Sequence, residues 1–366
     1  MATYVDDLFY VGHNDTVYYD EIKSCGFKLK GPMELKFHLG GDFKRVEEPE
    51  KVLTWGSATF INKILSKYEH MFGEPVPKRE VHAPLDPGDH PELDTSRLCT
   101  TEQVGLYQSM IGDLQWAVSL GRIDIYCATM TLGSYRAAPK IGHLERAKRV
   151  YSYLRNYKKT SIKFRTEIPN YDMYAQEKTT WDCVYHPCSE HIPTDAPEPR
   201  GKSVLTTTFK DANLLFDFVT GRSVTGIIHM MNKTPIDWFC KKQNTVETST
   251  YGSEFTAARI AVEQIIYLRY TLRMLGIPLI GPSVLLGDNK SVVDSAMIPS
   301  YRLKKRHNIL AFHRVRKAVA AGFIVMYHLA SCENPSDVLT KNRSSREFYS
   351  LMRLLLAWSW RDEIEK

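Results

Sequence analysis

Four acidic residues within a stretch of about 130 residues each stand where an expected strand ends or an expected helix begins. They are Asp211, Glu254, Asp288 and Asp337. Asp211 ends the alternating run 204–209, and Asp288 follows the apolar run 283–286, so both close a predicted strand. Glu254 opens a long helical pattern, and Asp337 follows an Asn-Pro turn near the start of a short helix. A fold built on a sheet can bring such positions together at one edge.

Carboxylates that are brought together predict a metal site. Like charges in one place oppose ionisation, and a divalent cation removes that opposition. Two hard cations bridged by Asp and Glu stabilise the attacking and leaving oxygens in phosphodiester cleavage. The alternative is that the four acids are separate and solvated, because their spacing alone is ordinary.

The order of elements around these acids predicts a mixed fold. Runs 204–209, 224–231 and 235–240 are expected to form an antiparallel meander of three strands. Expected helices at 253–275 and 306–320 alternate with expected strands at 283–287 and 323–329. The fold class is therefore α+β or mixed α/β, with a mixed sheet flanked by helices in the C-terminal half.

The sequence motifs around the acids resemble those of the ribonuclease H domain of copia-type retrotransposons. The matching motifs are Asp211-Ala212-Asn213, Lys241-Lys242-Gln243 with Thr245-Val246, Glu254-Phe255, Asp288-Asn289-Lys290-Ser291 and Asp337 to Lys341. Asn213 departs from the second aspartate of the family's Asp-Ala-Asp word and is not counted as a ligand.

The resemblance implies that Asp211, Glu254, Asp288 and Asp337 hold two Mg²⁺ ions, for which Mn²⁺ can substitute, with Asp211 bridging them. The implied reaction is endonucleolytic cleavage of RNA in an RNA–DNA hybrid. Asn289 and His307 match family positions as auxiliary residues. For His307, proton transfer and a satisfied structural histidine both remain open.

A cationic tract lies between the last two acids. No Asp or Glu occurs from Ser295 to Cys332. The candidate nucleic-acid-binding residues are Arg302, Lys304, Lys305, Arg306, Arg314, Arg316 and Lys317. Such a tract suits phosphate contacts on a hybrid duplex, and the alternative is a basic, solvated helix.

The N-terminal residues resemble a different part of the same polyprotein. Tyr4-Val5-Asp6-Asp7 between two expected strands resembles the palm motif of reverse transcriptases, and Asp6 and Asp7 are its metal-binding acids. The family's palm uses a third carboxylate on an earlier strand, together with fingers that hold the template. Both are missing here, so Asp6 and Asp7 are interpreted as a remnant of the polymerase motif.

The resemblance covers nearly the whole chain and predicts five parts. These are a palm remnant at 1–50, thumb and connection helices at 51–165, a linker or insertion at 166–202, a ribonuclease H-like domain at 203–345 and a helical tail at 346–366. Within the insertion, Cys183, His186, Cys188 and His191 suggest a zinc site, but their spacing matches no common zinc module. A mobile or locally packed insertion is the preferred interpretation.

Composition limits the class of protein. Hydrophobic residues make up 43% and charged residues 25% of 366 residues, which is ordinary for globular domains, and the net charge of +6 permits an anionic partner. Seven scattered cysteines and the absence of a signal-peptide pattern predict an intracellular protein, cytoplasmic in a retroelement particle or nuclear, that is not secreted. No apolar run is long enough to predict a membrane span.

The predicted function is metal-dependent ribonuclease H activity attached to an incomplete reverse transcriptase. The predicted partners are an RNA–DNA hybrid or template-primer and other parts of the polyprotein. One alternative is RNA-directed DNA polymerase activity if another chain supplies the missing palm and fingers. The other is a non-catalytic remnant that binds nucleic acid.

Overall fold

The chain separates into two units. The computed structural model describes residues 2–4, 7–9, 15–30, 33–46, 51–174, 180–303 and 306–357. The units are Met1–Leu39 and Gly40–Lys366. The first contains β1 (Ala2–Tyr4), β2 (Asp7–Phe9), α1 (Asp15–Ser24) and β3 (Phe37–His38). Strands β1 and β2 form the antiparallel hairpin that the sequence predicts. The predicted division into five parts is not tested by these units and stays a prediction.

The larger unit begins with a small antiparallel sheet and a group of helices. The sheet contains β4 (Gly41–Val46), β5 (Val52–Gly56), β6 (Ser161–Lys163) and β12 (Leu356–Ala357). The helices are α2 (Ala58–Phe72), η1 (Pro91–Leu93), α3 (Thr101–Ser119), η2 (Ile123–Ile125), α4 (Tyr126–Gly133), α5 (Ile141–Asn156) and α9 (Ser345–Met352). Helix α2 ends at Phe72, because Gly73 adopts the left-handed conformation that closes it.

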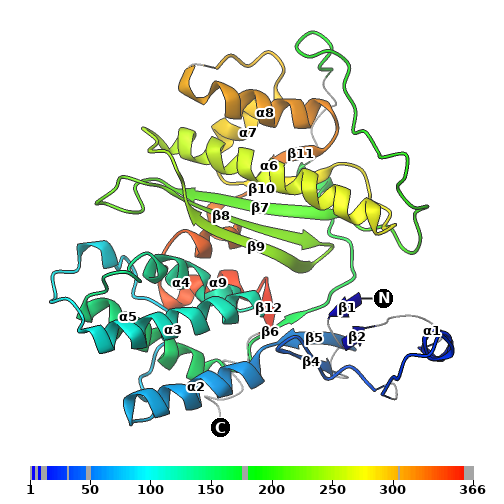
Figure 1. Cartoon of the computed structure of the whole chain (residues 1–366). Coiled ribbons are helices and arrows are strands. Elements are labelled where there is room, and N and C mark those ends of the chain that lie inside the picture. The colour runs from blue at the N-terminus through cyan, green and yellow to red at the C-terminus, as the bar shows by residue number, and fades with distance from the viewer. Residues whose placement is uncertain are drawn as a thin grey trace. The chain divides into compact units, whose positions relative to one another are not determined.

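A second sheet carries the four acids. It contains β7 (Thr206–Asn213), β8 (Val224–Met231), β9 (Thr234–Lys242), β10 (Ser283–Gly287) and β11 (Ile324–His328). The strand order is β11-β10-β7-β8-β9 (Figure 1). Strands β7, β8 and β9 form the predicted antiparallel meander, and β10 and β11 run parallel to β7. The mixed fold predicted from the sequence is confirmed.

Both faces of this sheet are covered. The remaining helices are η3 (Asp172–Tyr174), α6 (Thr250–Met274), α7 (Lys290–Met297), η4 (Arg306–Asn308), α8 (Ile309–Ala320), η5 (Ser331–Glu333) and η6 (Pro335–Leu339). Ile227 packs into the core formed with α6, α7 and α8, whereas its neighbour Ile228 packs into the core of the other helices. Successive residues of β8 therefore serve opposite faces, as the period of a strand requires.

Three local differences from the sequence prediction concern element boundaries. Strand β7 continues four residues beyond the predicted end at Phe209, so Asp211 lies inside it. Helix α7 was not predicted, because its eight residues follow Asp288 without a long apolar stripe. The tail predicted to be helical forms α9 and then the strand β12, which pairs with β6.

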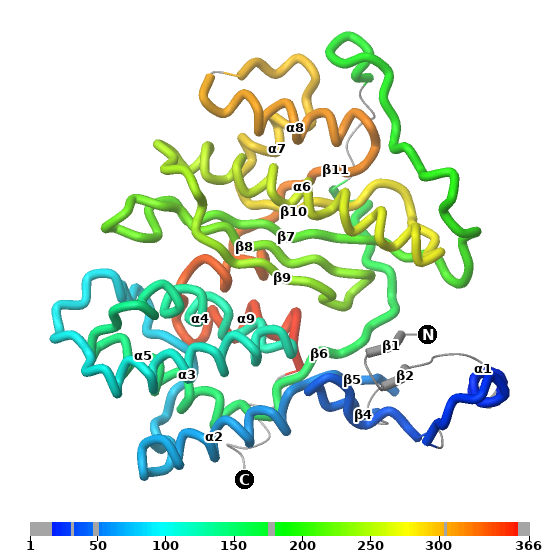
Figure 2. Tube along the Cα trace, viewed as in Figure 1, coloured from blue at the N-terminus to red at the C-terminus, as the bar shows by residue number. Residues whose placement is uncertain are grey.

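The insertion packs against the helices rather than projecting away from them. Glu190 accepts hydrogen bonds from Arg269 and Arg273 of α6, at 2.6 and 2.7 Å for the shorter contact of each. Tyr270 donates to the carbonyl of His191. Figure 2 shows this segment in green beside α6. The two arginines hold the pKa of Glu190 at about 2 against the opposing effect of burial, so the ion pair anchors the segment.

No helix among the described residues is long and apolar enough to cross a membrane.

The core of the helical group contains a buried ion pair. Arg122 donates to both oxygens of Asp124, at 2.9 and 2.6 Å, and Tyr153 also donates to Asp124. Both charged side chains are almost completely inaccessible to solvent. Loss of one partner would leave the other buried and uncompensated.

We therefore expect Asp124→Ala to destabilise the protein by roughly 3–5 kcal/mol, because the Arg122 guanidinium remains in the core without its counter-ion. Urea unfolding measures this change. Asp86→Ala is the matched control, since Asp86 pairs with Arg149 at the surface with 65% of its side chain exposed, and such pairs contribute about 0–1 kcal/mol. Equal effects of the two substitutions would contradict the assignment.

Candidate metal centre

Asp211 occupies the centre of the site. Its residue is 1% exposed, and it pairs with Gly226 across β7 and β8. A Cβ atom on Gly226 would lie 2.8 Å from the Ser336 carbonyl and from the Leu339 Cβ. Glycine at this position therefore lets η6, which carries Asp337, pack directly on the strand that carries Asp211.

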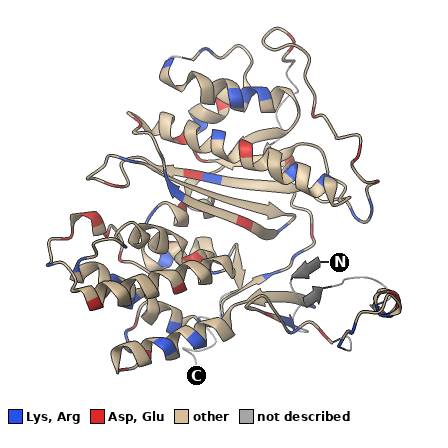
Figure 3. Ribbon diagram, viewed as in Figure 1, with Lys and Arg blue, Asp and Glu red and all other residues tan. Residues whose placement is uncertain are grey.

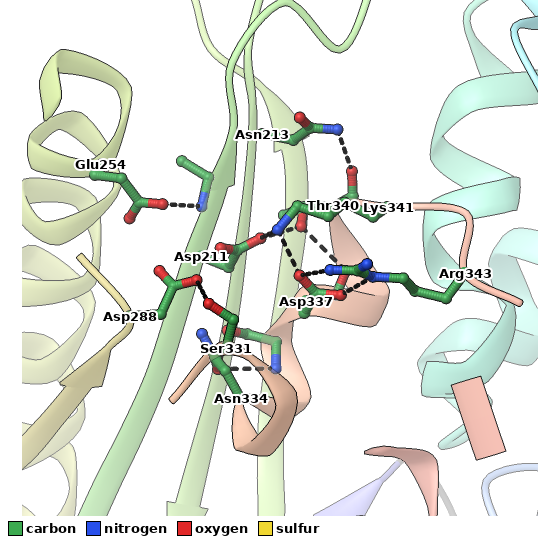
Figure 4. A network of polar contacts seen from close by, with 12 residues as sticks. Asp211, Asn213, Glu254, Asp288, Ser331, Asn334, Asp337, Thr340, Lys341 and Arg343 are labelled. Atoms are coloured by element: carbon green, nitrogen blue, oxygen red, sulfur yellow. Dashed lines mark hydrogen bonds and ion pairs between the residues drawn. The ribbon is translucent and has the colours of Figure 1, made fainter. Parts of the chain in front are cut away.

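Glu254 and Asp288 reach Asp211 from neighbouring elements. Strand β10 is parallel to β7 with Leu286 opposite Phe209, so Asp288 follows β10 at the level of Asp211. Helix α6 begins at Thr250, so Glu254 lies one turn further into it than predicted, and its Oε1 accepts a hydrogen bond from the amide of Ala212 at 3.2 Å. Ser331 donates to Asp288 Oδ2 at 2.8 Å (Figure 4).

Three of the four predicted acids converge. Among the described residues, Asp211, Glu254 and Asp288 offer oxygen atoms that all lie within 4.8 Å of one another. Asp211 Oδ1 is buried and has no hydrogen-bond partner. A buried carboxylate oxygen without a partner is costly, and a hard cation with oxygen ligands would satisfy it. These residues therefore fit a divalent metal ion.

Asp337 is not part of this group. It is buried on η6 next to Asp211, but both of its oxygens are already paired. Lys341 contacts Oδ1 at 2.5 Å, and Arg343 contacts Oδ2 at 2.5 Å. The Lys341 ammonium also lies 3.4 Å from Asp211 Oδ2 (Figure 4). The two neighbouring acids are thus connected through a lysine.

Lys210 is a residue of the site that the sequence prediction missed. Its side chain is completely buried, and its Nζ lies 2.5 Å from Glu254 Oε2. A Cβ atom on Gly287 would lie 2.4 Å from Lys210 Cε, so the glycine before Asp288 provides the space for the lysine. The sequence signal for Lys210 was a lysine next to an acid within a strand whose other residues are mostly buried. A buried ammonium requires a counter-ion, so such a lysine indicates a nearby carboxylate.

Burial and the neighbouring charges shift the pKa values of these groups. Burial raises the pKa of Glu254 to about 7, with Lys210 opposing and Asp211 adding to the rise. Burial also raises the pKa of Asp211, which Lys341 opposes and Asp337 and Asp288 reinforce. Burial lowers the pKa of Lys341, but the carboxylates of Asp211 and Asp337 outweigh it and keep that pKa above its usual value.

The predicted cationic tract is only partly a surface. Figure 3 shows the basic residues along α8. Arg302, Arg306, Arg314 and Lys317 are exposed, whereas Lys304 and Lys305 lie outside the described residues. Arg316 contradicts the prediction, because it is buried and donates to the carbonyls of Ser295, Ile298 and Pro299. A buried side chain that binds three backbone carbonyls holds α8 to the end of α7 and is not accessible to a nucleic acid.

Arg314 and Lys317 also have a neighbour that the sequence did not predict. They line a cavity of about 450 Å³ together with residues 184–189 of the insertion. The Lys317 Nζ lies 6.0 Å from the ring centroid of Tyr185. These two cations therefore face the insertion as well as solvent.

The auxiliary candidates lie outside the group of three acids. Asn289 caps α7, and its side chain accepts a hydrogen bond from the Val292 amide at 3.2 Å. His307 Nε2 lies 3.7 Å from Glu247 Oε2, and half of its side chain is exposed. A catalytic role for either residue stays a prediction.

Two other groups of candidates give no metal cluster among the described residues. Asp7 begins β2, but its side chain and all of Asp6 lie outside the described part of the chain. Cys183, His186, Cys188 and His191 are all within that part, yet they do not come together. Cys183 and Cys188 are exposed, free thiols.

The relatives of the chain are transposon polyproteins. No protein-family model matches it. A retrovirus-related Pol polyprotein from transposon RE1 of Arabidopsis thaliana is 24% identical over 350 residues, which cover 95% of this chain and 21% of the relative. A retrovirus-related Pol polyprotein from transposon TNT 1-94 of Nicotiana tabacum is 24% identical over 357 residues, which cover 93% of this chain and 23% of the relative. The predicted resemblance to copia-type retrotransposon polyproteins is confirmed.

The chain spans about a fifth of the length of these Pol relatives.

Solved structures give a weaker similarity. The N-terminal RNase H domain of a Mycobacterium tuberculosis protein is 11% identical over 41% of this chain and 98% of that chain, with a TM-score of 0.30. LC11-RNase H1 in complex with an RNA/DNA hybrid is 15% identical over 37% of this chain and 93% of that chain, with a TM-score of 0.30. TM-scores this low do not establish a shared fold, so the fold rests on the sheet topology itself.

The raised pKa of Glu254 predicts how the stability of the metal-free protein depends on pH. Between about 4.5 and about 7 the folded state binds a proton at Glu254 that the unfolded state has released, so stability falls as the pH rises through this window. We expect a loss on the order of 3 kcal/mol relative to Glu254→Gln, which cannot titrate there.

The measurement is urea unfolding of both proteins in EDTA from pH 4.5 to 8. The difference between wild type and Glu254→Gln isolates this group from histidines that titrate in both proteins. A wild-type stability that rises with pH relative to the variant would contradict the account, since it would mean that the Lys210 ion pair outweighs burial.

Proposed function

We propose that this chain cleaves the RNA strand of RNA–DNA hybrids by divalent-metal-dependent hydrolysis. One observation carries the proposal: three carboxylates, one within β7, one in α6 and one directly after β10, converge, and a buried oxygen of Asp211 has no partner. The copia-type resemblance supports it, because the converging residues are those of the matching motifs. Similarity to retrovirus-related Pol polyproteins over nearly the whole chain supports a role within such a polyprotein.

The metal would be Mg²⁺, with Mn²⁺ as a substitute, held by Asp211, Glu254 and Asp288. A bound divalent cation in such a site polarises the attacking water and the scissile phosphate. The water oxygen forms a bond to phosphorus, the bond from phosphorus to the 3′ oxygen breaks, and the proton passes to that oxygen. The products are a 5′-phosphate and a 3′-hydroxyl.

The remaining residues position these ligands. Lys210 and the amide of Ala212 each bind one oxygen of Glu254, which fixes the orientation of its carboxylate. Ser331 does the same for Asp288. Of the predicted nucleic-acid-binding residues, Arg302 and Arg306 are exposed and are proposed to contact phosphates. Such contacts to a hybrid backbone are not specific for sequence.

Cleavage of a labelled RNA–DNA hybrid tests the proposal. Wild-type protein is expected to cut the RNA strand with Mg²⁺ or Mn²⁺ and not in EDTA. Loss of a group that merely supports a metal ligand costs about 10–100-fold, so Asp288→Asn, which removes a ligand, should lower the rate by at least ~100-fold. Asp195→Asn, an exposed acid in the insertion, should cut like wild type.

The outcomes separate the alternatives. A folded wild-type protein that binds the hybrid but does not cut it would overturn the proposal and favour a non-catalytic nucleic-acid-binding protein. Equal cutting by Asp288→Asn and wild type would locate the chemistry elsewhere. Templated DNA synthesis by the chain with a complementing palm and fingers would favour the polymerase alternative.

Arg306→Ala is expected to weaken hybrid binding most at low salt. Removal of one phosphate-binding cation should reduce the slope of log affinity against log salt by roughly 0.9 if the hybrid behaves like duplex DNA. Fluorescence anisotropy in EDTA measures binding without cleavage. Arg97→Ala, an exposed arginine far from the tract in sequence, is the control. An unchanged slope for Arg306→Ala would exclude this residue from the interface.

A further inference from the structure

We propose that the Lys341 ammonium takes the place of a second divalent cation, so that this site binds one metal ion rather than the two implied by the resemblance. The inference rests on the proposed metal site of Asp211, Glu254 and Asp288. It concerns the other side of Asp211, where the fourth acid lies. Lys341 is the last residue of the matching motif Asp337 to Lys341. The number of bound ions can be counted without measuring activity.

The position of Lys341 is that of a bridging cation. Its Nζ lies 2.5 Å from Asp337 Oδ1 and 3.4 Å from Asp211 Oδ2. A second metal ion that used Asp211 and Asp337 together would have to enter this space. Figure 4 shows the lysine between the two carboxylates. The ammonium therefore supplies the positive charge that these two acids require when they are buried side by side.

Both oxygens of Asp337 are bound to cationic side chains, whereas Glu254 has one cationic partner and one backbone amide. Lys341 binds Oδ1, while Arg343 binds Oδ2 and also donates to Oδ1 at 2.9 Å. Burial is almost complete for the Asp337 side chain. A metal ion bound to Asp337 would lie close to these two cationic groups, and the repulsion between like charges opposes its binding. By contrast, Asp211 Oδ1, on the side of the three converging acids, has no partner to displace.

The charge of the cluster leads to the same conclusion. The net charge of the cluster is one negative when the four acids are ionised. Three cations are paired with them: Lys210, Lys341 and Arg343. One divalent cation changes that net charge to one positive. A second ion, with Lys341 still in place, would bring it to three positive, and uncompensated charge of that size is strongly unfavourable near buried groups.

Asn213 contacts the residue that precedes Lys341. Its side-chain amide donates to the Thr340 carbonyl at 3.0 Å, and the Thr340 hydroxyl donates to Asp211 Oδ2. An aspartate at 213, as in the family's motif, could not donate this hydrogen bond when ionised. The departure from the motif and the occupied second position are therefore parts of one arrangement.

Counting bound Mn²⁺ tests the inference. Isothermal titration calorimetry, together with electron paramagnetic resonance of free Mn²⁺, gives the number of ions per chain without any nucleic acid. Wild type is expected to bind one ion. Lys341→Met has a similar length and no charge, and it should gain a second ion, with affinity for that ion at least tenfold above any second binding in wild type.

Two variants control for charge and fold. Lys341→Arg keeps the charge and is expected to bind one ion. Lys233→Ala removes an exposed lysine from the turn between β8 and β9 and should also bind one. Because Arg343 still pairs with Asp337, Lys341→Met retains a counter-ion for the buried acid. Its circular dichroism and unfolding midpoint confirm that it folds.

Each result has a distinct meaning. Two ions of comparable affinity in wild type would overturn the inference and leave the proposed function intact. One ion in both wild type and Lys341→Met would show that Lys341 does not exclude the second ion. No ion in folded wild type would overturn the proposed metal site, and the inference with it.

Discussion

The arrangement of the sheet domain depends on the neutralisation of buried carboxylates. Asp211, Glu254 and Asp337 are all largely inaccessible to water, and ionised groups in such surroundings must be paired. Lys210 pairs with Glu254 on one side of Asp211, while Lys341 pairs with Asp337 on the other. One oxygen of Asp211 is left between them without a partner.

Two glycines make this arrangement possible. Gly226 lets η6 approach the sheet beside Asp211, and Gly287 leaves room for the Lys210 side chain under Glu254. A methyl group at either position would collide with backbone or with the lysine stem. The backbone thus determines how closely charges of opposite sign can be packed, and the pKa values of the acids follow from that packing.

Much of this could be predicted from the sequence. Strand β10 has the predicted bounds, because three consecutive apolar residues (Val284, Leu285 and Leu286) before Gly287 and Asp288 have few other interpretations. The meander was predicted from three successive runs typical of strands. Strand β7 was predicted too short, since the buried Lys210 and Asp211 look like the polar end of a strand. Helix α6 was predicted from its apolar stripe, with an error of three residues at its start.

The pairing of charges could not be predicted. Asp337 and Lys341 are four residues apart, but nothing in their spacing reveals that the lysine also approaches Asp211, 130 residues away in the chain. Arg316 looked like one more cation of a surface tract, and only the packing of α8 on α7 shows that it binds three carbonyls. Such roles depend on burial and on contacts between distant segments, which a single sequence does not record.

The most direct test of the account is a crystal structure of the protein soaked with Mn²⁺, in which anomalous scattering locates each ion. The account predicts one strong peak in contact with Asp211 Oδ1 and with oxygens of Glu254 or Asp288, and Lys341 still between Asp211 and Asp337. No peak at Asp211 would contradict the metal centre itself. A second peak between Asp211 and Asp337, with Lys341 displaced, would contradict the role given to that lysine.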